Sequence, residues 1–554
     1  MSSSMVSPKI TRQIRNKVKS GCTTCKIRKV KCDEARPSCD RCISTGRVCD
    51  GYGIWGGGSS FRKTPVRLST PLSLNALSSI EGGFEYFDWF KCRTVKKLPG
   101  SFMSGFWTTL LFQASTEEPA VLHALLALSS VHKQGTLDIE TPFDRDGTPS
   151  KQEQFSLQHY LKATKHLQPH LSANDRASSR VALIACVVFV CSDLLQGNFM
   201  TAQTHMYHGL EIIGETSSLC NKKNGVLLLK PCQNSTDKWI VEALSRLHLQ
   251  MELFKHSYSH PRIVLLEDGP EVRTLVFESI KHAWKVLERL LNKIFHLTHL
   301  ARQHSVLEYA PNNVLSDYQS HIRNELSHWL VAYESLGRIS QGHRSDDEEK
   351  CERLLYKYQV MATIMADASL KVDDEMVYDD YTDRFMLLIT QLATLSTLTP
   401  VHGQPRRVMD MSHSVIDLGW IPLLYYTATK CRVHRIRLQA IRLLESRAHR
   451  EGIWDSIVTA CIARKVLQIE EGEFYEGLSI DDDFPLLGCP SPEDLSAPIL
   501  PEIYRIRKLE VVLNGAPVDT ISLFYGDMLD GVDCRVLLAE FDMNAKAWKD
   551  KEHR

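Results

Sequence analysis

Six cysteines within residues 22–49 constrain this chain more than any other feature of its sequence. They form one unit, Cys-x2-Cys-x6-Cys, which occurs twice with an offset of 17 residues: Cys22, Cys25 and Cys32, then Cys39, Cys42 and Cys49. A segment this short has too few apolar residues to fold by hydrophobic burial. The N-terminus has no apolar export signal, so we expect a reducing compartment and cysteines that are thiols or metal ligands.

The number of cysteines favours a metal cluster with shared ligands. A structural zinc ion takes four ligands in a tetrahedron, so six thiolates fill one site and leave two over. Two zinc ions need eight ligand positions, which six thiolates supply only when two of them bridge both metals. The repeat favours Cys22 and Cys39 as the bridging pair, and the other two cysteines of each unit would complete one metal each. We expect folding to depend on Zn²⁺, with a tight turn in each x2 gap and a short helix in each x6 gap.

The basic residues are concentrated in the first cysteine unit. Residues 1–50 hold twelve Lys or Arg against four Asp or Glu, a net charge of +8 that the rest of the chain balances. Arg and Lys bind phosphates and read guanine O6 and N7 in the major groove, so we expect binding to double-stranded DNA at GC-containing sites. The predicted contact residues are Lys26, Arg28, Lys29 and Lys31, with Lys17 and Lys19 as further DNA-positioning cations.

This stretch resembles the fungal binuclear zinc-cluster (Zn2Cys6) transcription factors. The resemblance covers all six cysteines, the basic segment KIRKVK and Pro37. It implies that the end of the first helix reads a CGG-type triplet, with Arg28 and Lys29 at the bases, although many members have Lys at both positions. Three other interpretations stay open: a disulfide framework, a zinc module of another type, and a metal site that serves protein contacts without DNA.

Composition divides the chain into a basic head, a linker and a body. The Gly-, Ser- and Pro-rich linker contains a G-x-G-x-x-G match without the flanking strand and helix that a dinucleotide site requires. No apolar heptad follows the cysteines, so a homodimer would have to form through another segment. The predicted units are a basic arm at 1–17, a Zn2Cys6 DNA-binding domain at 18–52, a flexible linker at 53–83 and a helical regulatory domain at 84–554.

The body is predicted to be mainly α-helical, with strands mainly near the C-terminus, at 504–513 and 521–527. Its longest apolar run, residues 181–191, is too short to cross a membrane and is expected to be a buried helix. Residues 106–132 and 194–213 resemble the all-helical regulatory region of the same fungal factors. The fold class is therefore a small zinc cluster, a linker and a large helical domain.

The body offers no recognisable catalytic motif, so we expect no enzyme. His205 and His208 are three residues apart on a predicted helix, and we interpret them as an ordinary pair because no other ligand lies at metal-binding spacing. Segment 469–487 combines seven acids with aromatic residues and no Lys or Arg. It is a candidate activation segment for a coactivator, and a solvated acidic loop is the alternative.

These features predict a zinc-dependent, sequence-specific DNA-binding regulator of RNA polymerase II transcription, located in the nucleus. The resemblance implies control of metabolic genes, in some family members of a secondary-metabolite cluster. Two alternatives remain: a zinc-stabilised adaptor that does not bind DNA, and an enzyme whose helical body carries an unrecognised site.

Overall fold

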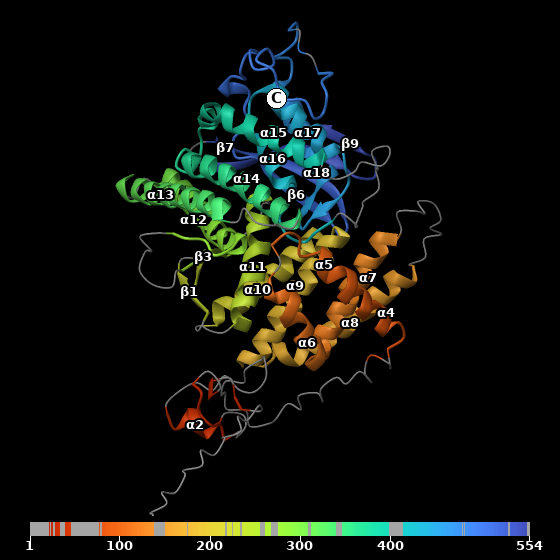
Figure 1. Cartoon of the computed structure of the whole chain (residues 1–554). Helices are drawn as coiled ribbons and strands as arrows, with labels where there is room; N and C mark the ends of the chain where they lie inside the picture. The colour runs from red at the N-terminus through yellow and green to blue at the C-terminus, as the bar shows by residue number, and fades with distance from the viewer. Residues whose placement is uncertain are drawn as a thin grey trace, which may run out of the picture.

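The computed structural model (Figure 1) describes most of the chain. The described residues are 21–22, 24–25, 28–33, 39–45, 77, 80–102, 104–137, 150–173, 175–216, 219–223, 225–232, 235–254, 261–266, 275–307, 312–339, 346–397, 414–478, 480, 482–529 and 532–550. The predicted basic arm and most of the predicted linker lie outside them.

The first part of the body, orange to yellow-green in Figure 1, consists almost entirely of helices. They are α4 (Gly83–Trp89), η1 (Phe90–Thr94), α5 (Val95–Lys97), η2 (Phe106–Leu110), α6 (Leu111–Glu117), α7 (Pro119–Leu137), α8 (Lys151–Leu171), α9 (Arg176–Gln196), α10 (Phe199–Glu215) and α11 (Ser235–Phe254). Segments η1 and η2 are π-helical.

Helix α9 is the central helix of this part. The Asp175 side chain accepts a hydrogen bond from the Ser178 N–H at its start, and Gly197, in the left-handed region at φ 79°, ends it. It is the one described helix long and apolar enough to cross a membrane, and 94% of that stretch is buried in the body. The prediction of a buried helix at 181–191 is therefore confirmed.

The second part of the body, green to blue in Figure 1, adds helices and strands. Its helices are α12 (Ile280–Leu307), α13 (Asn312–Ile339), α14 (Asp346–Ala368), η4 (Glu375–Tyr381), α15 (Thr382–Thr397), α16 (Ile421–Lys430), α17 (His434–Glu445), α18 (Ser456–Glu471) and η5 (Glu502–Tyr504). Helices α16 and α17 follow each other closely in the chain. Cys431 takes an extended conformation between them, at φ −69° and ψ 143°, and ends α16.

The strands form three small sheets. Strands β1 (Cys220–Lys223), β2 (Val226–Leu229) and β3 (Arg262–Leu265) form one sheet, and the short strands β4 (Arg450–Glu451) and β5 (Trp454–Asp455) pair with each other. The third is an antiparallel meander of β6 (Glu510–Gly515), β7 (Val518–Leu529), β8 (Val532–Asp542) and β9 (Ala547–Asp550). The predicted strands near the C-terminus are confirmed as β6 and β7, whereas β1 to β5, β8 and β9 were not predicted.

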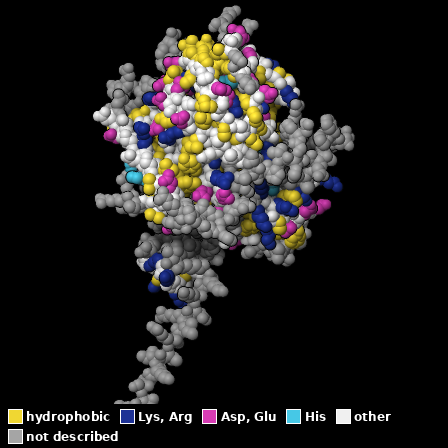
Figure 2. All heavy atoms as spheres, turned by 45° about the horizontal axis from the view of Figure 1, so that its top comes forward, with side chains coloured by type: hydrophobic (Ala, Val, Ile, Leu, Met, Phe, Trp, Pro, Cys, Tyr) yellow, Lys and Arg dark blue, Asp and Glu magenta, His cyan; other side chains and the backbone are white. Residues whose placement is uncertain are grey.

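One continuous hydrophobic core joins both parts of the body, from Leu77 to Leu538, and the buried cysteines of the N-terminal module form a second, separate cluster. The mainly helical fold class is therefore confirmed. On the face shown in Figure 2, hydrophobic side chains lie among acidic and basic ones, and Lys and Arg side chains gather on the small module below the body.

A buried charge cluster connects the two parts of the body. The Arg246 guanidinium of α11 donates hydrogen bonds to Asp417 Oδ2 at 3.0 Å and Glu242 Oε1 at 3.1 Å, and its Nε lies 3.6 Å from Glu288 Oε2 of α12. Burial raises the pKa of Glu288 to about 7, while Arg246 opposes this shift. One guanidinium thus faces three carboxylates, and a proton on Glu288 relieves part of the excess negative charge.

We expect Glu288→Gln to stabilise the body at pH 8. A carboxyl group whose pKa is higher in the folded state stabilises the fold below its unfolded pKa, and this stabilisation is lost as the pH rises through the folded pKa. Urea denaturation at pH 8 should show that the free energy of unfolding of Glu288→Gln exceeds that of the wild type by roughly 1–3 kcal/mol. This difference should disappear near pH 5. Glu278 is exposed, so Glu278→Gln is the control and should change the urea denaturation curve neither at pH 8 nor at pH 5. A less stable Glu288→Gln protein at pH 8 would show that the ionised carboxylate holds Arg246.

Candidate metal centre and nucleic-acid interface

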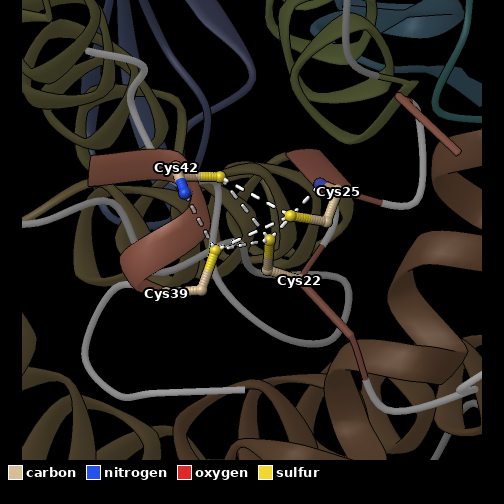
Figure 3. A group of neighbouring side chains, drawn as sticks. All are labelled: Cys22, Cys25, Cys39 and Cys42. Carbon is tan, nitrogen blue, oxygen red and sulfur yellow. Dashed lines mark hydrogen bonds between the residues drawn. The ribbon is translucent and has the colours of Figure 1, made fainter. Parts of the chain in front are cut away.

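Four sulfur atoms converge in the N-terminal module, as Figure 3 shows. They belong to Cys22, Cys25, Cys39 and Cys42, all fully buried. The Sγ atoms of Cys22 and Cys39 are 3.6 Å apart, and those of Cys25 and Cys39 are 3.7 Å apart. Cys42 Sγ lies 3.9 Å from both Cys22 Sγ and Cys25 Sγ. Thiolates about 2.3 Å from one zinc ion are about 3.8 Å apart in a tetrahedron, so this donor set fits zinc.

The sequence repeat is reproduced in the local geometry. The Cys25 N–H donates a hydrogen bond to Cys22 Sγ, and the Cys42 N–H donates to Cys39 Sγ, both at 3.3 Å. In the second unit Cys39 is the N-cap of helix α2 (Asp40–Ile43). The sulfur thus satisfies one backbone donor that a helix start leaves without a partner. The prediction of a turn in the x2 gap and a helix in the x6 gap is wrong for this unit. Helix α2 spans the x2 gap and ends at the first residue of the x6 gap.

The structure describes only one of the two remaining predicted ligands, Cys32 and Cys49. Cys32 is 5% exposed, and its Sγ accepts a hydrogen bond from the Cys22 N–H at 3.3 Å, so it lies beside the four converging sulfurs. Cys49 lies outside the described residues. The structure therefore brings five of the six predicted ligands into one buried cluster. None of the fourteen cysteine side chains that it describes forms a disulfide.

The cysteine thiols of the cluster must lose their protons when they bind a metal ion. Burial raises the pKa of the Cys25 thiol and of the Cys39 thiol above the ordinary value for cysteine. Without a metal both groups are protonated at neutral pH, whereas a zinc ligand must be a thiolate. Metal binding at this cluster therefore releases protons, and its affinity falls as the pH is lowered.

Asp33 connects the two cysteine units and was missed in the sequence. Its Oδ1 accepts a hydrogen bond from the Asp40 N–H at 3.0 Å, and its Oδ2 accepts one from the Arg41 N–H at 2.7 Å. A carboxylate from the first unit thus covers the N-terminus of α2 in the second unit, where negative charge is favourable. An acid directly after the third cysteine was the available sequence signal.

The predicted DNA-contacting residues differ in whether their side chains contact the protein or extend into solvent. The Arg28 Nη1 donates to Thr45 Oγ1 at 3.3 Å, which holds Arg28 against the second unit. Lys29 and Lys31 are exposed. Lys29 has a left-handed backbone, φ 56°, and the next residue, Val30, donates its N–H to Cys25 O at 3.1 Å, a closure typical of a helix end. Lys17, Lys19 and Lys26 lie outside the described residues.

The two histidines singled out in the body do not converge on a shared site. His205 Nε2 lies 2.6 Å from the Tyr160 hydroxyl and 3.7 Å from Asp193 Oδ2. His208 is exposed, and its Nδ1 lies 3.3 Å from Glu211 Oε2 on the same helix. Each has its own partners, so the interpretation as an ordinary pair is supported by their contacts.

The acidic segment 469–487 is packed against the body at its start and at Phe484, and its role as an activation segment stays a prediction. Phe484 is 8% exposed, with the guanidinium groups of Arg435 and Arg442 at 3.3 Å and 4.6 Å from its ring centre. Glu470 and Glu471 are buried and bind Arg437. Glu470, Glu471 and Phe484 thus have partners inside the molecule, whereas Glu473, Glu476 and Asp482 are exposed.

Comparison with known proteins identifies two segments of the chain. Residues 20–54 match the fungal Zn(2)-Cys(6) binuclear cluster domain, and residues 84–250 match the fungal specific transcription factor domain. The described cysteine cluster and helices α4 to α10, with most of α11, lie within these segments. The match to a binuclear zinc domain, together with the four convergent sulfurs, confirms the prediction of zinc as the cofactor.

The similar curated proteins are fungal transcription regulators. The Aspercryptin biosynthesis cluster-specific transcription regulator atnN of Emericella nidulans is 31% identical over 240 residues, 39% of this chain and 38% of that protein. The transcription regulator lscL of Purpureocillium lilacinum is 27% identical over 210 residues, 34% of this chain and 48% of that protein. The transcription factor lfc1 of Flammulina velutipes is 43% identical over 61 residues, 11% of this chain and 18% of that protein.

The chain spans less than half the length of each of these three relatives. No solved structure matches it. The domain boundaries predicted at 18–52 and 84–554 stay predictions, because the matched segments end elsewhere. The resemblance found in the sequence is confirmed by both matches: residues 20–54 and 84–250 are similar to two domains of fungal transcription regulators.

Proposed function

We propose that this chain is a nuclear, sequence-specific DNA-binding regulator of RNA polymerase II transcription that reads CGG-type triplets. One observation carries the proposal: the buried sulfur cluster holds a helix end from which Lys29 and Lys31 extend into solvent. Cations on a small rigid support are suited to phosphates and to guanine O6 and N7. Lys17, Lys19, Lys26 and Arg28 complete the proposed contact set.

The proposed metal centre contains two zinc ions with Cys22 and Cys39 as bridging ligands. Their sulfurs are 3.6 Å apart, a spacing that allows both of them to bind the same zinc ions. Cys25 and Cys32 would complete one metal site, and Cys42 and Cys49 the other. Cys25 Sγ and Cys42 Sγ are only 3.9 Å apart, a spacing that also suits one shared zinc, so metal content distinguishes two ions from one.

The proposed organisation assigns a basic arm to 1–17, the DNA-binding domain to 18–52, a linker to 53–83 and regulation to 84–554. The chain acts without enzyme chemistry of its own. The printed name of atnN, a cluster-specific regulator of aspercryptin biosynthesis, supports a metabolic or secondary-metabolite gene set as the target. Binding-site selection from random duplex DNA would also report whether one copy or two bind each site.

The test is to select DNA sites with the full chain and to compare Lys29→Gly with Arg41→Ala. Glycine keeps the left-handed backbone at position 29, so this variant removes only the side chain. We expect Lys29→Gly to lose roughly 10- to 100-fold in affinity for the selected site and much of its sequence preference. Arg41→Ala, on the supporting unit, should lose much less. An equal affinity of the wild-type chain for selected and unrelated duplexes would contradict the proposal.

A further inference from the structure

An open groove lies on the surface of the first part of the body, far along the chain from the zinc cluster. It has a volume of about 450 Å³ and is lined by Phe87, Lys91, Val95, Lys96, Thr108 and Phe112. The rings of Phe87 and Phe112 meet edge to face with their centres 6.3 Å apart, and Phe112 packs in the same way on buried Phe90 at 5.4 Å. The floor is therefore aromatic and firmly supported from below.

Both walls of the groove contain π-helical segments. Lys91 lies in η1 and Thr108 in η2, while Val95 is the first residue after η1 and Phe112 the second residue after η2. A π-helical turn is rare, occurs mostly as a single turn inside an α-helix, and is frequent at functional sites. Here two of them face one groove, on elements that the family match includes but to which it assigns no residue roles.

The rim of the groove carries positive charge that no described carboxylate neutralises. Lys91 and Lys96 line the groove and are exposed, and no carboxylate of a described residue lies within ion-pair distance of either. Nearby Lys133 differs, because it forms an ion pair with Glu85. The groove thus combines an apolar aromatic floor with an unpaired basic rim.

We propose that this groove binds an acidic amphipathic segment of a partner protein, with aromatic or aliphatic side chains on the floor and carboxylates at the rim. The unpaired cations supply the charge complementarity. The aromatic floor favours a peptide over a DNA backbone, which presents phosphates and sugars without apolar anchors. The open shape favours a peptide over a small effector, because small-molecule sites bury most of their ligand.

The experiment uses the full chain and a fluorescent synthetic peptide in which Asp and Glu alternate with Phe and Leu. We expect saturable binding by fluorescence anisotropy that weakens with rising salt. Lys91→Glu/Lys96→Glu should weaken binding at least about tenfold, since it reverses the rim charge. Thr108→Trp, at an exposed position, should also weaken it by filling the groove. The matched control, Lys222→Glu/Lys223→Glu on exposed β1, should bind as the wild type does.

Four outcomes would overturn the proposal. A peptide of equal charge with Ser in place of Phe and Leu could bind equally well, which would show unspecific attraction. The β1 control could lose as much affinity as the groove variant. The binding of random duplex DNA could depend on Lys91 and Lys96 while peptide binding does not, which would assign the groove to DNA. The Lys91→Glu/Lys96→Glu variant could instead abolish self-association of the chain, which would assign the groove to a second copy. None of these outcomes depends on whether the zinc cluster reads CGG triplets.

Discussion

Cys39→Ser is expected to abolish both zinc binding and sequence-selective DNA binding while the helical body stays folded. The Cys39 sulfur lies within 3.7 Å of two other sulfurs and also accepts the Cys42 N–H at the start of α2. Its loss therefore removes a proposed bridging ligand and a helix cap together. Zinc contributes on the order of 10–16 kcal/mol to the folding of small zinc modules, so no other interaction in this segment can replace it.

The measurements for this variant are zinc per chain, affinity for the selected DNA site and thermal unfolding of the body. We expect two zinc ions in the wild type, at least about a 100-fold loss of affinity in Cys39→Ser, and an unchanged unfolding temperature, because the body has its own core. Exposed Cys92→Ser is the matched control and should retain zinc and affinity. Full selective DNA binding by Cys39→Ser would refute the zinc-dependent mechanism.

The zinc module was predictable because its chemistry is local in sequence. The spacing of Cys22, Cys25, Cys39 and Cys42 alone led to a metal cluster, and the structure brings these four sulfurs together. The position of α2 could not be derived from ligand spacing, because a cysteine sulfur serving as the N-cap decides where that helix starts.

The body was predictable where helical periodicity is strong and unpredictable where distant residues decide. Helix α9 follows from its apolar run, whereas β3 exists because it pairs in parallel with β2 across an intervening helix. The start of α8 has a local signal, because its capping box, Ser150 with Glu153, is visible in the sequence.

Segment 469–487 shows the same limit for function. Its acids and aromatic residues suggested a free activation segment, but their partners lie earlier in the chain, on α17. Arg435 and Arg442 cover Phe484 there, and His434 Nε2 lies 2.8 Å from Asp482 Oδ1. The partners of Phe484, Glu470 and Glu471 are tens of residues away in the chain, so local sequence could not separate these packed residues from the exposed acids between them.

Arg437→Ala is expected to destabilise the body by about 3–5 kcal/mol, because it removes the counter-charge that two buried carboxylates share. Only Arg432 would then remain beside Glu470, and His434 beside Glu471. The Arg437 side chain is fully buried, and its guanidinium donates to Glu470 Oε2 at 2.6 Å, to Glu471 Oε1 at 3.2 Å and to Ala428 O at 2.9 Å. Glu470 also accepts a hydrogen bond from the Ile506 N–H at 2.8 Å. The destabilisation by Arg437→Ala would therefore extend from α17 and α18 to the segment that leads into β6.

Arg464→Ala is the matched control because Arg464 makes an equally regular ion pair at the surface. Its Nε and Nη2 donate to the two carboxylate oxygens of Glu445, both at 2.8 Å, and its side chain is 48% exposed. An exposed pair contributes up to about 1 kcal/mol, so urea denaturation followed by tryptophan fluorescence should separate the two variants clearly. Equal losses would mean that burial does not set the value of the Arg437 contacts, and that water reaches Glu470 and Glu471 when the arginine is removed.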